Sequence, residues 1–322
     1  MATLDLKQKW SELTTNPVTN GFRSLRISAD CICELYLGVS SESKRSLILS
    51  LPSNKILDFK GTQKENISIE YFREKNLIVL QSTHSEYNDI FDDLILSLYQ
   101  GIKNLTQVDD YSKYFIHSFY RWSEFFDDKP SEILSEDIIK GIIGELLILK
   151  LLIKEPDRPE INFLLKAWTG PYDKGNDFEL ENKNLEVKSK TPLSNDISIS
   201  SEFQLEVMHG KGLELYVVSL ISDYTIGIKL NNLVLEIKEL VQESSGDNAI
   251  FWKALNQKNI TAKNISLYDI YRFAPVNWIA YNCSNEKFPK LNKSCIPEEI
   301  SNLEYTLNLT SLKSFIIKQG KF

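Results

Sequence analysis

Alternating apolar and polar positions predict a sheet in the first quarter of the chain. The runs are rich in Ile, Leu, Val and Tyr and are separated by Ser-rich or Asn-containing turns; they lie at residues 31–39, 45–51, 66–71 and 77–81. Residues 72–76 are expected to form a hairpin turn between the last two runs. We therefore predict an antiparallel sheet of about four or five strands.

Helical spacing replaces the alternation after about residue 86. Helices are predicted over residues 89–105, 110–126 and 136–153, with Ser135 as an N-cap and Asp128-Lys129-Pro130 ending the second helix. The second helix carries an aromatic stripe. A core or inter-helix seam is the favoured interpretation of this stripe, over a surface that stacks bases.

The remainder mixes short strands and helices. Strands are predicted near residues 167–168, 177–180, 185–189, 213–221 and 225–230, and helices over 202–208, 231–243 and 249–257, with mixed strands to the end. The succession from the helix at 136 onward is αβββαβ. It predicts a compact α/β layer with polar residues at the centre of its sheet.

Composition limits the classes of function. The 322 residues contain 37 Lys and Arg against 44 Asp and Glu, a net charge of −7, so the chain is no general polycation for nucleic acid, although one face can still be basic. The three histidines lack metal-site spacing, and the four cysteines are interpreted as reduced core residues. The first residues lack an apolar leader and no long apolar run follows, so we expect a cytoplasmic protein that does not enter membranes.

Residues 176–190 combine a hairpin pattern with clustered charges. Two period-two runs flank a polar turn at 181–184. If Leu180 pairs with Leu185, Glu179 faces Glu186 and Asp177 faces Lys188, with the apolar side chains on the other face.

Carboxylates placed this close repel each other unless a cation lies between them. Mg²⁺ takes one or two carboxylates with waters and phosphate oxygens, and a lysine beside it can orient a water for phosphodiester hydrolysis. The alternative is a solvated hairpin face with cross-strand ion pairs of about 0–1 kcal/mol each.

Glu145 lies in the apolar helical stretch IIGELLILKLLI, at residues 142–153. A glutamate among apolar neighbours needs a partner, or else it occupies a narrow exposed stripe; both interpretations remain open. Gly141 and Gly144 beside it suggest close packing of the helix backbone.

Several segments resemble one known family. They are GIIGEL at 141–146, WTGP at 168–171, NDF at 176–178, LEVK at 185–188 and ISSEFQL at 199–205, with later echoes at Phe273, Phe288-Pro289 and Tyr305-Thr-Leu307. The chain resembles the PD-(D/E)XK nuclease superfamily, and within it the prokaryotic family named "PD-(D/E)XK motif protein". Asn176 stands where the superfamily's name has proline.

The resemblance implies a fold for the core, and the change of pattern along the chain indicates the boundaries around it. The fold is mixed α/β (α+β), with a restriction-endonuclease-like αβββαβ core. We expect an N-terminal antiparallel domain at 1–85, connecting helices at 86–130, the nuclease-like core at 131–230 and a C-terminal α/β extension at 231–322.

The resemblance also implies roles for the charged residues. Asp177, Glu186 and the carbonyl of Val187 would hold Mg²⁺, with Mn²⁺ as a substitute, and Lys188 would position the attacking water. Glu145 would bind a second ion or a metal-bound water. In the expected register, Glu179 is an alternative ligand.

Four polar residues are candidates for contact with nucleic acid: Ser198, Ser200, Gln204 and Lys190. Gln204 would point from a helix start toward the active face. It also fits a capping box with Ser201, and a solvated lysine is the ordinary interpretation of Lys190.

The function implied is a Mg²⁺-dependent DNA endonuclease of a prokaryotic restriction or anti-phage defence system. ATPase, helicase or methyltransferase subunits are expected partners, and double-strand cleavage would favour a homodimer. One alternative is a catalytically silent subunit that binds nucleic acid or acts as a scaffold. Another is a plain interaction protein.

Overall fold

The computed structural model describes residues 4–14, 18, 21–127, 133–172, 175–291, 296–297, 299–300 and 303–322. The chain divides into two compact units. The first comprises Met1–Pro130 with Thr261–Lys263, and the second comprises Ser131–Ile260 with Asn264–Phe322.

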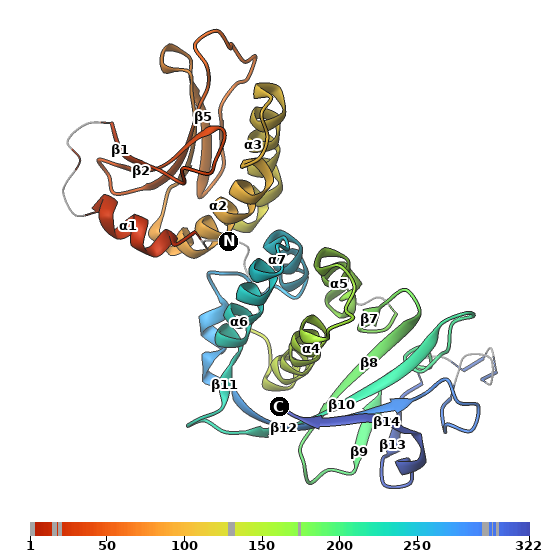
Figure 1. The fold of residues 1–322 in the computed structure, drawn as a ribbon. Helices are drawn as coiled ribbons and strands as arrows, with labels where there is room; N and C mark the ends of the chain where they lie inside the picture. The colour runs from red at the N-terminus through yellow and green to blue at the C-terminus, as the bar shows by residue number, and fades with distance from the viewer. Residues whose placement is uncertain are drawn as a thin grey trace. The chain divides into compact units, whose positions relative to one another are not determined.

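The first unit is an antiparallel sheet with helices packed on it (Figure 1). Its strands are β1 (Phe22–Arg26), β2 (Glu34–Ser40), β3 (Arg45–Ser50), β4 (Thr62–Gln63), β5 (Ile67–Phe72) and β6 (Leu77–Ser82), in the order β1-β2-β3-β6-β5-β4. Its helices are α1 (Leu6–Thr14), α2 (Asn88–Ile102) and α3 (Val108–Ser123). The predicted antiparallel sheet, the hairpin turn at 73–75 and the two later helices are confirmed, but the sheet has six strands where four or five are expected.

The aromatic stripe of α3 belongs to the core of this unit. Phe115, Phe119, Trp122 and Phe126 are fully buried, so a base-stacking role for them is excluded. Cys31, Cys33 and Cys283 are buried free thiols, as expected. Cys295 and the predicted helix end at 128–130 lie outside the described residues.

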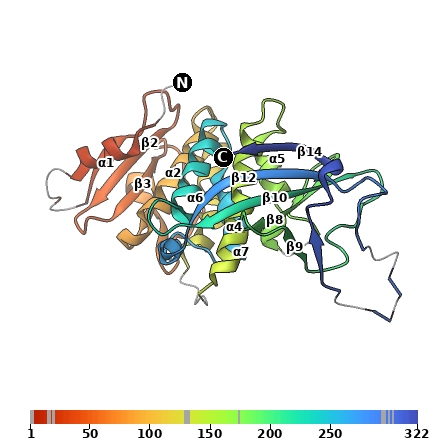
Figure 2. The same cartoon turned by 90° about the horizontal axis from the view of Figure 1, so that it is seen from below.

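The second unit packs helices on a mixed sheet. The strands run in the order β11 (Ile228–Lys229), β12 (Arg272–Asn282), β10 (Gly212–Ser222), β8 (Lys183–Lys190) and β7 (Phe178–Glu179), and β14 (Ile316–Lys321) also pairs with β12. β8 and β10 are parallel, and the other pairs are antiparallel. Figure 2 shows β14, β12, β10 and β8 side by side in that order.

A separate two-stranded sheet joins β9 (Asp196–Ile199) to β13 (Tyr305–Asn308). The helices of this unit are α4 (Glu136–Lys154), α5 (Ile161–Ala167), α6 (Leu230–Glu243) and α7 (Asn248–Gln257). α4 lies against β8 and β10, with α6 beside it (Figure 1). The mixed α/β fold with an N-terminal antiparallel sheet is thus confirmed, and no helix among the described residues is long and apolar enough to span a membrane.

Three predicted elements of this unit are wrong. Residues 202–208 form turns, because Phe203 and Met208 are exposed and supply no apolar stripe, while the Asn176 side chain binds the carbonyl of Gln204. The expected αβββαβ order therefore lacks its inner helix. Ala167 ends a helix, and Trp168 forms only an isolated bridge to Phe178. Of 225–230, only Ile228–Lys229 is a strand, because Leu230 already begins α6.

Gly144 allows α4 to approach β8 closely. Its neighbours along the helix are almost all buried aliphatic side chains, and Ser135 caps the helix start as predicted, accepting a 3.4 Å hydrogen bond from Ile138 N. A Cβ on Gly144 would lie 2.1 Å from Ser189 Oγ. At Gly141 nothing lies within 4 Å of such a Cβ, so the packing reason expected there is wrong.

We predict that Gly144→Val lowers the free energy of unfolding by about 1–3 kcal/mol, because the branched side chain would overpack the contact with Ser189 and Val187. Gly141→Val is the matched control, since it adds the same side chain to the same helix where space is open. Urea denaturation of both variants tests this. Equal effects of the two substitutions would contradict the packing role of Gly144.

Candidate active site

One pocket of the second unit gathers most of the residues that the sequence singled out. Its volume is about 310 Å³, and its lining comprises Asp137, Lys140, Gly141, Glu145, Asp177, Glu186, Val187, Lys188, Ser189 and Gln204. α4 contributes Glu145, the residue before β7 is Asp177, and β8 contributes Glu186 and Lys188. Glu145, Asp177, and the pair Glu186 and Lys188 thus come from three separate segments of the chain.

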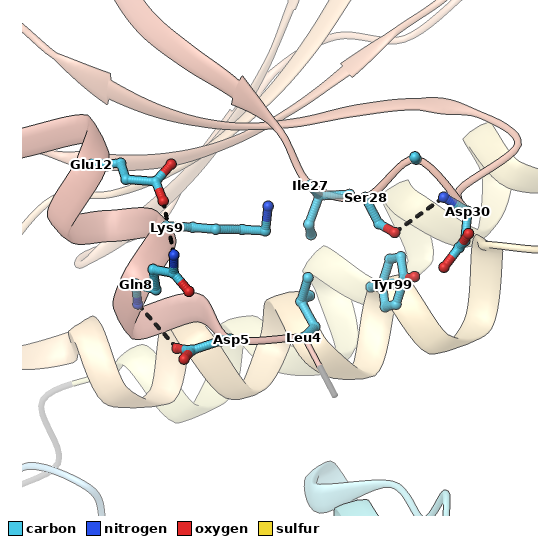
Figure 3. A pocket seen from close by; sticks show the side chains of 10 residues that line it. Leu4, Asp5, Gln8, Lys9, Glu12, Ile27, Ser28, Asp30 and Tyr99 are labelled. Atoms are coloured by element: carbon cyan, nitrogen blue, oxygen red, sulfur yellow. Dashed lines mark hydrogen bonds between the residues drawn. The ribbon is translucent and has the colours of Figure 1, made fainter. Parts of the chain in front are cut away.

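A second hollow lies in the first unit, between α1, the loop after β1 and α2 (Figure 3). Two of its charged side chains are committed to local structure. Asp5 accepts from the backbone N–H of Gln8 at the start of α1, and Glu12 accepts from the Gln8 side chain. These residues are exposed, so this hollow lacks the buried titratable groups of the first pocket.

The hairpin register differs from the prediction by two residues. Phe178 pairs with Leu185 and Glu179 with Asn184, and Leu180 N donates to Lys183 O at 2.9 Å, so the turn is shorter than expected. Continuing this register sets Asp177 opposite Glu186. Because the shift is an even number of residues, every side chain keeps its predicted face of the hairpin. Glu179 is exposed and does not line the pocket.

Trp168 fixes the carboxylate of Glu145. Its indole Nε1 donates a 2.7 Å hydrogen bond to Glu145 Oε2. The indole is buried and lies 5.8 Å from the ring of Phe251 on α7. Glu145 therefore faces the pocket and has a buried partner. The interpretation that Glu145 lies on a narrow exposed stripe of the helix is excluded.

Gly170 lies where two of the carboxylates converge. A Cβ built on this residue would lie 2.4 Å from Glu145 Oε2 and 2.9 Å from Asp177 Oδ1. The backbone holds Asp177 in place, because Val187 N donates to its Oδ2 at 2.7 Å and Gly170 N donates to its carbonyl at 3.0 Å.

Burial and mutual repulsion disfavour the charged forms of the three carboxylates Glu145, Asp177 and Glu186. Burial raises the pKa of Glu145 well above its ordinary range, and the charge of Asp177 raises it further. Burial is also the main cause of the raised pKa of Asp177 and of Glu186, and Asp177 adds to the shift at Glu186. Such a group of acids is stable when it holds protons or when a cation joins it.

Lys188 is the positive group in closest contact with these acids. Its Nζ lies 3.1 Å from Glu186 Oε1 and donates a 2.9 Å hydrogen bond to Gln204 Oε1. The same oxygen of Gln204 accepts from Ser200 N at 2.8 Å. Gln204 thus holds the ammonium from within a turn, and a capping role at a helix start does not apply.

The sequence did not identify Asn176 as a site residue. Its buried side chain donates to Glu186 Oε2 at 3.2 Å and to the carbonyl of Gln204 at 2.7 Å, and it accepts from Asn184 Nδ2 at 3.2 Å. It therefore ties the strand of Glu186 to the turn of Gln204. A polar residue next to the motif aspartate was the available signal.

Lys258 was also missed. It follows α7, and its charge lowers the pKa of both Glu145 and Asp177. No local pattern links it to the hairpin, since about seventy residues separate the two in sequence.

Three predicted nucleic-acid contacts lie outside the pocket lining. Ser198 donates to Glu304 at 2.8 Å on the separate two-stranded sheet, and Ser200 is exposed. Lys190 Nζ is turned toward its own loop and donates to the carbonyls of Thr191 and Ser194. Gln204 alone of the four lines the pocket.

The donor set fits a hard divalent cation. Within the described part of the chain, no three His, Cys, Asp or Glu side chains are already closed around a metal position. Asp177 and Glu186 line one pocket, and Glu145 approaches Asp177 at Gly170. This set suits an ion such as Mg²⁺, which takes one or two carboxylates and completes its shell with water and phosphate oxygens.

The second unit is thus a mixed α/β fold in which Asp177, Glu186 and Lys188 lie together in one acidic pocket. A family model with the description "Putative PD-(D/E)XK family member, (DUF4420)" matches residues 6–310. The chain belongs to this PD-(D/E)XK family, whose superfamily consists generally of nucleases that use divalent metals. No curated protein and no solved structure gives a significant match.

The raised pKa of Glu145 predicts a pH-dependent stability. The folded state binds this proton more tightly than the unfolded state, so the stabilisation is complete below the ordinary glutamate range and is lost as the pH rises through the raised pKa. We expect metal-free Glu145→Gln to exceed the wild type in free energy of unfolding at pH 8 by about 1 kcal/mol or more, with a smaller difference at pH 5.

Urea denaturation in the presence of EDTA at both pH values measures this difference. The amide oxygen of Glu145→Gln can still accept the hydrogen bond from Trp168, so the loss of the negative charge is the main change. A gain in stability that is the same at both pH values, or no gain at pH 8, would show that the charge of Glu145 does not destabilise the folded protein.

Proposed function

We propose that the chain is a divalent-metal-dependent nuclease that hydrolyses phosphodiester bonds of DNA. The observation that carries this proposal is the convergence of Glu145, Asp177, Glu186 and Lys188 on one pocket. Because these residues come from separate segments of the sequence, a chance cluster of surface charges does not explain why they meet in one pocket. The raised pKa values of the three carboxylates support the same conclusion, because a bound cation would relieve them.

Asp177 and Glu186 would hold Mg²⁺, or Mn²⁺ in its place, together with the carbonyl of Val187. When bound, the ion would stabilise charge on the phosphate and favour deprotonation of a nearby water. Glu145, fixed by Trp168, would bind a second ion or an ion-bound water.

Lys188 would orient the attacking water. Its ammonium is held between Glu186 and Gln204, so it has few alternative positions within the pocket. Asn176 would keep these two partners at a fixed separation. This arrangement supports positioning as the main contribution of the chain's own side chains.

The biological setting is part of the proposal. In it, the core at 131–230 cuts DNA in a cytoplasmic restriction or anti-phage system, and ATPase, helicase or methyltransferase partners supply target selection. The domain at 1–85, the helices at 86–130 and the extension at 231–322 would serve that assembly. A homodimer would allow both strands to be cut.

Incubation of supercoiled plasmid with the protein and Mg²⁺ or Mn²⁺ tests the activity. We expect nicking or linearisation that EDTA abolishes and that Lys188→Ala lowers by about 100-fold or more, because the water loses its positioning group. Lys150→Ala is the matched control, since Lys150 pairs with Glu236 outside the pocket.

Cleavage that persists unchanged in both Lys188→Ala and Asp177→Asn would contradict the assigned site. A wild-type protein that binds DNA without cutting it under any metal condition would instead indicate the alternative, a catalytically silent subunit.

A further inference from the structure

The first turns of α4 form one wall of the pocket. Asp137, Lys140, Gly141, Gly144 and Glu145 follow the i, i+3, i+4, i+7, i+8 spacing of a single helix face. Four of them line the pocket, and Gly144 instead packs against Ser189. This face therefore leads from the start of α4 to the carboxylate of Glu145.

The packing of α4 does not explain why residue 141 on this face is a glycine. A Cβ there would meet nothing within 4 Å, and Gly141 does not have a positive φ. Glycine in a helix interior is less favourable than alanine. What the missing side chain preserves is open volume beside the pocket, one helical turn before Glu145.

Lys140 stands next to this open volume. Its side chain is half-buried at the pocket wall, and among the described residues its ammonium has no hydrogen-bond or ion-pair partner. Lys188, the other lysine of the lining, is already engaged by Glu186 and Gln204. An anion entering beside α4 would therefore find Lys140 as its available cation.

We propose that Lys140 and Gly141 form a binding subsite for a backbone phosphate of the polynucleotide, adjacent to the phosphate that is cut. The proposal rests on the nuclease function proposed above. Gly141 leaves room for the phosphate to approach the helix, and Lys140 pairs with its charge. Four residues of helix span about 6 Å, so the subsite lies about one nucleotide step from Glu145.

A single bound phosphate explains both the glycine at position 141 and the Lys140 ammonium, which is unpaired among the described residues. A phosphate binds lysine as a point charge and carries no base information, so this contact adds affinity and register without sequence preference. It also gives an acidic pocket a local attraction for a polyanion, which the net charge of the chain does not supply.

Binding of a fluorescein-labelled DNA duplex, with Ca²⁺ in place of Mg²⁺, tests the subsite at several salt concentrations. We expect Lys140→Ala to weaken binding several-fold and to reduce the slope of log K against log salt by about 0.9, one phosphate contact. Lys140→Arg should restore the slope. Lys154→Ala, at the exposed far end of α4, is the matched control and should behave as wild type.

Gly141→Ala and Gly141→Val test the open volume. We expect both to retain the wild-type melting temperature or exceed it, because the helix gains a better residue without a clash. Both should nevertheless weaken DNA binding, the valine variant more strongly. A lower melting temperature for Gly141→Ala would overturn the steric argument.

The outcomes separate this proposal from the nuclease proposal. If the wild type cuts DNA while Lys140→Ala and Gly141→Val bind and cut as well as it does, the subsite alone is wrong. If the wild type neither binds nor cuts DNA, the nuclease function fails and the subsite fails with it.

Discussion

The repulsion among Glu145, Asp177 and Glu186 is the constraint around which the second unit is organised. Burial raises the pKa of all three side chains, so the chain bears a cost for bringing them together. Each is restrained by a different donor: the indole of Trp168, the backbone N–H of Val187 and the amide of Asn176. These hydrogen bonds hold the three carboxylates in position for a cation. Natural proteins commonly accept lower stability at functional sites of this kind.

Distant segments hold these groups in place. Gly144 sets the distance between α4 and β8, and thereby between Glu145 and Glu186. Phe251 packs on Trp168, and Lys258 at the end of the same helix moderates the charge of two carboxylates. The later part of the chain, expected only as an extension of the core, thus contributes directly to the electrostatics of the pocket.

The sequence predicted the faces of the hairpin better than its register. Period-two alternation specifies which side chains share a face, and a shift of two residues preserves that pattern, so Asp177, Glu186 and Lys188 were correctly grouped while Glu179 was paired wrongly. Residues 202–208 are predicted as a helix, with Ser201 and Gln204 fitting a capping box, but the segment forms turns and the Asn176 side chain binds the carbonyl of Gln204. The roles of Asn176 and Lys258 depend on contacts between distant residues, and no local pattern reports such contacts. Helix α1 and strand β1 were likewise not predicted.

Calorimetric titration of the metal-free protein with Mn²⁺, without DNA, tests the central claim most directly. The account predicts saturable binding at pH 8, weaker binding at pH 5 where protons compete for the carboxylates, and a rise in melting temperature with added ion. Asp177→Asn should lose most of this binding, whereas Glu179→Gln, on the neighbouring strand but outside the pocket, should keep it. Absence of binding in the wild type, or equal binding by Asp177→Asn, would contradict the claim that these carboxylates are arranged for a cation.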